Sequence, residues 1–122
     1  MGAVEMTEDM TVLAIFTEVR GFTKWFEATE EFINMDLFAT GYVGILRRNF
    51  KSPEFQIKPL GDGAMILSSV PDRPTPRELT RLLGRTLTTI AHAEREFKKH
   101  CIEFSQRVGH SANLSLGWGI VR

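Results

Sequence analysis

The feature that most constrains the fold of this chain is an apolar run that ends in a carboxylate and leads into a glycine turn. The run covers residues 11–17, Glu18 follows it directly, and Gly21-Phe22-Thr23 comes next. Because the run is continuously apolar instead of alternating, it predicts a strand over residues 11–17 that is buried on both faces. Phe22, Trp25 and Phe26 then fall on one helical face, which predicts a helix that begins at Gly21.

A second acidic residue is expected at the tip of a hairpin. Residues 55–58 alternate like a half-buried strand, and residues 64–70 are again typical of a strand. Between them, Gly61-Asp62-Gly63 is a strong signal for a tight turn. A first strand and a following hairpin can lie adjacent in one sheet, so we expect Glu18 and Asp62 to lie at the same edge of that sheet.

Two longer helices and a last strand complete the pattern. A break over residues 29–34 precedes a helix from Met35 to about Asn49. Three prolines then precede a long helix from about Arg77 to Phe104, and residues 114–120 alternate as a closing strand does. The apolar stripes of these two helices consist of Met35, Phe38, Tyr42, Ile45 and Leu46, and of Leu79, Leu83, Ile90, Ala93, Phe97, Cys101 and Phe104.

The order β-α-α-β-β-α-β predicts an α+β fold. We expect a ferredoxin-like (palm-type) sandwich, in which the helices pack on one face of a mainly antiparallel sheet. Residues 1–9 are polar and lack periodicity, which predicts a frayed lead-in, and residues 10–122 are expected to form one domain.

Composition argues against two classes of partner. The 15 Lys and Arg residues balance 15 Asp and Glu residues, so no global field favours nucleic acid or an anionic membrane. No apolar run approaches the length of a membrane span, which predicts no membrane contact from this chain. The single cysteine, Cys101, lies in an apolar helical pattern and is interpreted as a buried structural thiol. Since it cannot form an internal disulfide, we expect a cytoplasmic location.

Glu18 and Asp62 suggest chemistry when they are taken together. Two carboxylates at one sheet edge suit Mg²⁺ or Mn²⁺, which share their remaining positions with phosphates and water. The amides of Gly21, Phe22 and Thr23 open a helix and are expected to attract an anion. The plain alternatives are an exposed Glu18 at a strand–helix junction and an Asp62 that only favours its turn. The three histidines, His92, His100 and His110, are too dispersed for a metal pair and are interpreted as surface or capping residues.

Three segments together resemble the catalytic domain of class III adenylyl/guanylyl cyclases. Residues 16–23 (FTEVRGFT) resemble that family's phenylalanine-x-aspartate-isoleucine-x-glycine-phenylalanine-threonine element. Residues 58–63 (KPLGDG) resemble its lysine-x-x-glycine-aspartate hairpin, and residues 116–120 (LGWGI) resemble its glycine-containing strand. The resemblance runs in register from about residue 10 to the last residue.

The resemblance implies a reaction and a set of roles. The family converts ATP to cyclic AMP and pyrophosphate by two-metal chemistry, and its active sites form between two chains or two homologous domains. By this resemblance Glu18 and Asp62, with the Val19 carbonyl, would hold Mg²⁺ or Mn²⁺. Gly21, Phe22, Thr23 and Gly61 would bind the substrate, and Lys58 would read the purine, with ATP favoured over GTP. A second cyclase-like chain, as homodimer or heterodimer, is the implied partner.

Two departures from the family pattern lead to alternatives. Glu18 stands where the family has an aspartate, which moves the carboxylate by about one C–C bond in a kind of site where roughly 1 Å can cost 100-fold in rate. Arg122 ends the chain within the glycine-containing strand, before the family's transition-state residues, so we expect a weak or inactive chain and assign no catalytic residue. The first alternative is therefore a non-catalytic cyclase-like module that binds nucleotide or regulates a partner. A second is another palm-type nucleotidyl-transfer domain, such as a diguanylate cyclase.

Overall fold

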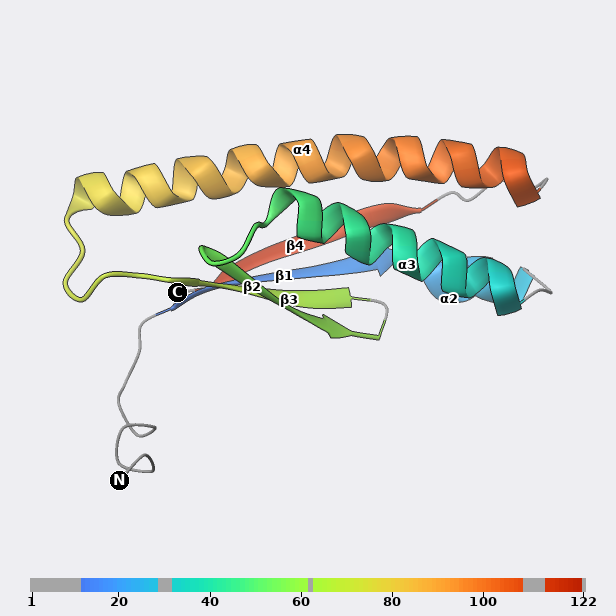
Figure 1. The fold of residues 1–122 in the computed structure, drawn as a ribbon, viewed down its shortest axis with the longest axis horizontal. Coiled ribbons are helices and arrows are strands. Elements are labelled where there is room, and N and C mark those ends of the chain that lie inside the picture. The colour runs from blue at the N-terminus through green and yellow to red at the C-terminus, as the bar shows by residue number, and fades with distance from the viewer. Residues whose placement is uncertain (1–11, 29–31, 62, 109–113, 122) are drawn as a thin grey trace, which may run out of the picture.

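The structure is a computed structural model that describes residues 12–28, 32–61, 63–108 and 114–121. Its elements follow the predicted order and are shown in Figure 1. They are β1 (Val12–Arg20), α2 (Phe22–Ala28), α3 (Phe32–Asn49), β2 (Phe55–Leu60), β3 (Gly63–Ser69), α4 (Pro76–Val108) and β4 (Ser115–Val121). The α+β class predicted from the sequence is confirmed.

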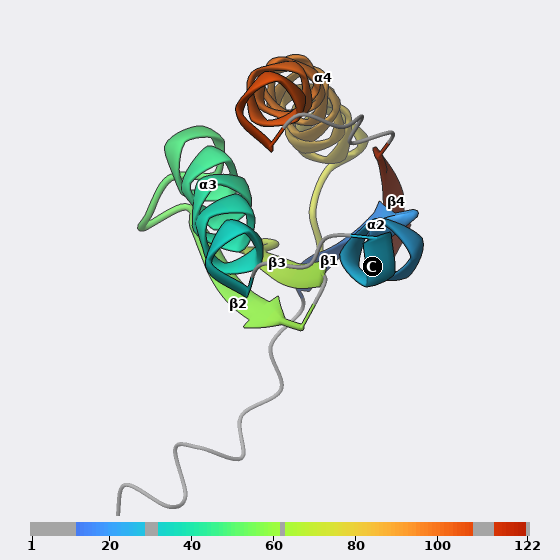
Figure 2. The same ribbon diagram turned by 90° about the vertical axis from the view of Figure 1, so that its right-hand side faces the viewer.

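The four strands form one antiparallel sheet in the order β2-β3-β1-β4. Helices α3 and α4 lie on the same side of this sheet in both views (Figures 1 and 2). Helix α3 contacts α4 and β2, and α4 contacts β4. The side chains that point away from these helices form the second face of the sheet, which we call the open face.

The prediction that the first strand is buried on both faces is wrong. Along β1 the burial alternates: Leu13, Ile15, Thr17 and Val19 are buried, whereas the residues between them are more exposed. The reason is that α3 and α4 cover only one side of the sheet. An apolar residue on the other side, such as Phe16, therefore remains 42% exposed although its strand is central.

The core lies between the helices and the covered face of the sheet. The α3 stripe is confirmed from Phe38 to Leu46, and the α4 stripe from Ala93 to Phe104, because these apolar positions are buried. Leu83 is an exception at 39% exposure. Aromatic rings fill the end of the core beside α2, where Phe38 lies 5.0 Å from Trp25 and 5.5 Å from Phe104 between ring centroids.

Helix boundaries follow local chemistry that the sequence only partly revealed. Helix α4 begins at Pro76, one residue before the predicted start, because Thr75 caps it. The Thr75 hydroxyl accepts a hydrogen bond from the Glu78 amide (3.1 Å) and donates one to the Glu78 carboxylate (3.1 Å). This N-cap satisfies an amide that would otherwise lack a helical partner. Helix α3 begins at Phe32, three residues before the predicted Met35.

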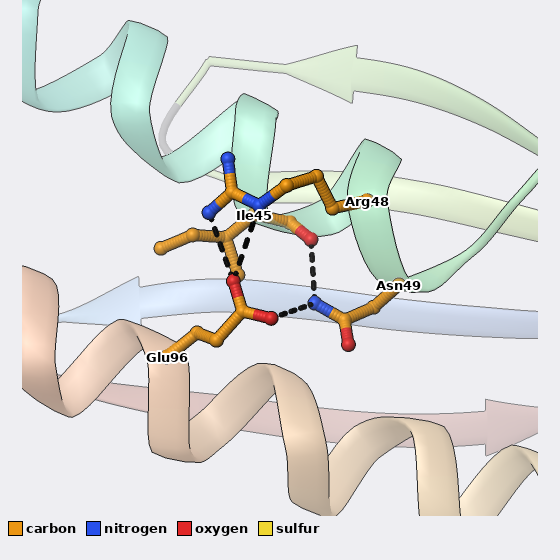
Figure 3. Close-up of polar contacts among 4 residues, drawn as sticks. All are labelled: Ile45, Arg48, Asn49 and Glu96. Atoms are coloured by element: carbon orange, nitrogen blue, oxygen red, sulfur yellow. Dashed lines mark hydrogen bonds and ion pairs between the residues drawn. The ribbon is translucent and has the colours of Figure 1, made fainter.

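A polar clamp joins α3 to α4 (Figure 3). The Glu96 carboxylate accepts hydrogen bonds from the Arg48 guanidinium (2.8 Å) and from the Asn49 amide (3.2 Å). Asn49 also donates to the Ile45 carbonyl (2.8 Å), which orients its amide. The hydrogen bond from Arg48 holds the pKa of Glu96 below its ordinary value, although partial burial acts in the opposite direction.

The sequence predicted the burial of one α4 side chain, Cys101, but not that of another, His100. Cys101 is buried, as expected for a structural thiol, and burial raises the pKa of its thiol to about 11. His100 is not the surface residue that we expected. Its ring is half-buried and lies against the backbone of α3 at Gly41. The contact is so close that a Cβ at Gly41 would lie 2.4 Å from the His100 Cε1.

Candidate functional site

The register of the sheet places the β2–β3 hairpin beside Glu18 on the open face. Gly63 pairs with Glu18, and Glu18 pairs with Gly117, so the end of the hairpin lies directly beside the end of β1. Two adjacent cross-strand rows form this part of the face. In the order β2, β3, β1, β4, the first row contains Leu60, Gly63, Glu18 and Gly117, and the second contains Lys58, Met65, Phe16 and Gly119.

Glycines shape the loops that lead into this corner. Gly21, with φ of 83°, turns the chain from β1 into α2, and its carbonyl accepts the Trp25 amide hydrogen bond (3.1 Å). Gly61, with φ of 62°, makes the hairpin turn. Left-handed backbone at both positions favours glycine because it has no Cβ. The two glycine signals in the sequence are thereby explained by backbone geometry.

Gly63 is required for a different reason, which is the close approach of β3 to β1. A Cβ at Gly63 would lie 2.5 Å from the Thr17 carbonyl oxygen and 3.6 Å from the Glu18 Cβ. Any side chain at this position would therefore push the hairpin away from the Glu18 backbone. The absence of a side chain also leaves the space beside Glu18 open on the face of the sheet.

A groove of about 350 Å³ lies over these rows on the open face. The apolar side chains of Phe16 and Leu60, which are 42% and 46% exposed, line this groove. Glu18 and Arg20 line its polar end. Gly117 and Gly119 leave the β4 side without side chains. The groove thus combines an apolar part, a carboxylate and a guanidinium.

Glu18 is well solvated, and within the described part of the chain it forms one ion pair. The Arg20 Nε lies 3.9 Å from the Glu18 Oε1, and the two side chains are 65% and 67% exposed. A carboxylate in this position is free to exchange partners, because exposed ion pairs contribute little stability. Val19, the other metal residue assigned with it in β1, turns its side chain into the core, so only its backbone carbonyl is available.

The remaining predicted residues differ in how they relate to this corner. Asp62 and the Thr23 side chain lie outside the described part of the chain. The Phe22 ring packs in the aromatic core, with its centroid 6.2 Å from that of Trp25, so only the backbone amide of Phe22 is left to contact a phosphate. Lys58 shares the open face with Glu18 but lies two strands away and in the next row, about 12 Å at the usual strand and residue spacings, and does not converge with it. Among the described residues, no three His, Cys, Asp or Glu side chains group as a metal site would require.

Two features of the groove were missed at the level of sequence. Arg20 was read only as a position in a motif, although its guanidinium lies in the groove. Gly117 makes room for it, since a Cβ there would lie 2.6 Å from the Arg20 Nε. Alternation along β1 puts Glu18 and Arg20 on the same face, which is the signal that could have revealed the pair. Trp118 is packed against the core, and its indole donates to Glu94 (2.9 Å).

Comparison of the sequence with protein-family models and with curated proteins gives no match. Among the described helices, none combines the length and the apolar character that a membrane crossing requires.

Proposed function

We propose that this chain is a class III nucleotide cyclase domain that converts ATP to cyclic AMP and pyrophosphate as part of a dimer. The observation that carries the proposal is the pairing of Glu18 with Gly63, the residue that directly follows Asp62 in the sequence. The two acidic motifs that resemble the cyclase family are therefore adjacent across the sheet, as a shared metal site requires.

The arrangement of the elements supports a palm-type, ferredoxin-like sandwich. Strands β2 and β3 form a hairpin beside β1, and β4 takes the other side of β1. Both long helices lie on the face opposite the groove (Figure 2). This leaves a solvent-accessible sheet face on which a nucleotide can lie, with the loop between β1 and α2 at one end.

The residues at the corner have the chemistry that Mg²⁺ or Mn²⁺ prefers. The exposed Glu18 carboxylate and the Val19 carbonyl are oxygen donors, and Asp62 would supply a second carboxylate. A bound divalent ion would offset the charge of the phosphates and activate the attacking 3′-oxygen. The amides of residues 21–23 would hold the phosphate chain, with Gly61 shaping the turn beside it, and Lys58 would contact the purine.

The separation between Glu18 and Lys58 supports a site shared by two copies. The two side chains carry opposite charges and lie on the same face, about 12 Å apart by the usual spacings between strands and along them. When two such faces meet about a two-fold axis, Lys58 of each copy can approach the acidic corner of the other. Phe16 and Leu60 supply exposed apolar area beside these charges. Such a dimer, acting in the cytoplasm, is the assembly that we propose.

A regulatory module without activity is the second candidate. It is favoured by the ion pair between Glu18 and Arg20, in which the carboxylate already has a cationic neighbour. Glu18→Asp separates the two candidates, because it restores the aspartate of the family motif. A large gain in metal-dependent turnover identifies a weakened enzyme, and an unchanged, negligible turnover identifies the module.

The test of the proposed reaction is an assay for cyclic AMP with ATP and either Mn²⁺ or Mg²⁺, on the protein at the full length of its gene. A parallel reaction with GTP, with chromatography of its products, tests for the cyclic dinucleotide that a diguanylate cyclase would make. We expect cyclic AMP, with Mn²⁺ more effective because it tolerates the longer Glu18 side chain better. Absence of cyclic AMP with both metals, in wild type and in Glu18→Asp, would contradict the enzyme proposal.

A further inference from the structure

Arg20 occupies a defined position on the open face of the sheet. It is the last residue of β1 and follows Phe16 and Glu18 on the same face of the strand. Its guanidinium lies over the backbone of β4, where Gly117 has no side chain. An added Cβ at Gly117 would meet the Arg20 Nε at 2.6 Å, the Nη2 at 2.9 Å and the Cζ at 3.0 Å. The position of the guanidinium therefore depends on this glycine.

The charge of Arg20 is available for a ligand. Its partner Glu18 lies at 3.9 Å, longer than a hydrogen bond, and both side chains are about two-thirds exposed, at 65% and 67%. Exchange of such a partner costs little because water screens the pair. The guanidinium also presents several N–H donors in a rigid plane, which suits the oxygens of a phosphate better than a point charge does.

The groove around Arg20 selects the kind of ligand. Its volume of about 350 Å³ is in the range of small-molecule sites. Phe16 and Leu60 line it with apolar side chains, and Arg20 adds a cation. A molecule with a flat apolar group and a polyanionic chain fits this distribution. A nucleoside triphosphate belongs to this class.

We propose that Arg20 binds the phosphate chain of the ligand and that Gly117 positions its guanidinium for this contact. The identity of the ligand as a nucleotide rests on the proposed function, but the contact between Arg20 and a polyphosphate does not. In the absence of a metal ion, Glu18 opposes the binding of the anion, because its negative charge lies beside the site. A divalent cation at Glu18 removes this repulsion and leaves Arg20 free to turn toward the phosphates.

The experiment is calorimetric titration of the chain with inorganic tripolyphosphate in metal-free buffer. We expect Arg20→Gln to weaken binding roughly tenfold, as loss of one charge-assisted contact would, and Arg20→Lys to give an intermediate affinity. Glu18→Gln should have the opposite effect and tighten binding, because it removes the competing carboxylate. Arg77→Gln, which removes an exposed arginine from α4 on the other side of the sheet, is the matched charge control and should bind as wild type does.

Gly117→Ala tests the positioning role without a change of charge. The new methyl group displaces the guanidinium, so tripolyphosphate affinity should fall several-fold. Gly84→Ala is the control for the added methyl, since nothing lies within 4 Å of a Cβ at that position. Circular dichroism of each variant establishes that it is folded before titration.

The tripolyphosphate titrations test the role of Arg20 and Gly117 independently of the cyclase reaction. Loss of affinity in Arg20→Gln and Gly117→Ala supports it, whether or not cyclic AMP is formed. It is overturned if wild type does not bind tripolyphosphate, or if folded Arg20→Gln binds as tightly as wild type. A failure to make cyclic AMP, with these binding results intact, counts only against the proposed function.

Discussion

Gly63 shows how much of the site depends on a single residue. Its Cα lies so close to β1 that a Cβ would approach the Thr17 carbonyl oxygen to 2.5 Å. Because backbone atoms cannot move aside cheaply, Gly63→Ala should separate the hairpin from β1. We expect it to lower the free energy of unfolding by about 2 kcal/mol, as overpacked sites usually do, in a urea titration. Gly119→Ala, where nothing lies within 4 Å, should leave stability nearly unchanged.

The lowered pKa of His100 makes the free energy of unfolding depend on pH. Burial lowers its pKa below the ordinary value of 6.5, although the Phe38 carbonyl and Glu103 act in the opposite direction. Arg107 and Arg48 also lower the pKa. The unfolded chain therefore binds a proton at a higher pH than the folded chain does. Stability should be greatest above the unfolded pKa and should fall as the pH decreases through 6.5 toward the folded pKa.

Urea titrations between about pH 7.5 and 5 check this dependence on His100. His100→Gln should flatten the decrease of stability on the acidic side, whatever its effect at neutral pH. His92→Gln, a change of an exposed histidine of the same helix, should retain the wild-type slope. Equal slopes in wild type and His100→Gln would contradict the assignment.

At the scale of elements, the N-terminus of α4 depends on its cap. The Thr75 hydroxyl accepts the Glu78 amide hydrogen bond, so Thr75→Ala leaves that amide without its capping partner. We expect a loss of about 1 kcal/mol in the free energy of unfolding, measured with urea. Thr80→Ala lies one turn further along the same helix and should be neutral or slightly stabilising. A neutral Thr75→Ala would show that the cap contributes nothing.

The elements themselves were largely predictable, and the reasons for the errors are physical. Periodicity located β2, β3, β4 and the buried stripe of α4, because each has a side that must face the core. The same argument failed for β1, because its open face also carries apolar residues and the sequence therefore lacks the alternation of a half-buried strand. The start of α3 at Phe32 was missed because residues 29–34 were interpreted as a break between helices, although Thr29 followed by Glu30 and Glu31 is a signal for a helix start.

The site was predictable only in part. Sequence motifs indicated the acidic corner, and the β1–β3 register agrees with it for Glu18 and Gly63. The distance between Glu18 and Lys58 was not evident, because it depends on β3 lying between their strands. Arg20 and Gly117 are far apart in the sequence and meet only through the pairing of β1 with β4. A contact of this kind depends on the order of strands, which local patterns do not specify.

At the scale of the whole molecule, the open face predicts self-association. Phe16 and Leu60 are 42% and 46% exposed, and they lie on the same two strands as the opposite charges of Glu18 and Lys58. Phe16→Glu adds a charge at the centre of this face and should shift the protein toward monomer in sedimentation velocity experiments. Leu87→Glu, at a residue that is 57% exposed on α4, should leave the association unchanged. A wild type that stays monomeric at high concentration would contradict the dimer.

The central claim is that Glu18 and Asp62 form one divalent-metal site, and Mn²⁺ binding tests it most directly. Free Mn²⁺ is measured by electron paramagnetic resonance while protein is titrated in the presence of a non-hydrolysable ATP analogue. We predict that Glu18→Gln and Asp62→Asn each weaken Mn²⁺ binding at least tenfold, and that the double variant is little worse than either single variant. Glu103→Gln, on α4, should bind as wild type does. Unchanged Mn²⁺ binding in both single variants would contradict the account.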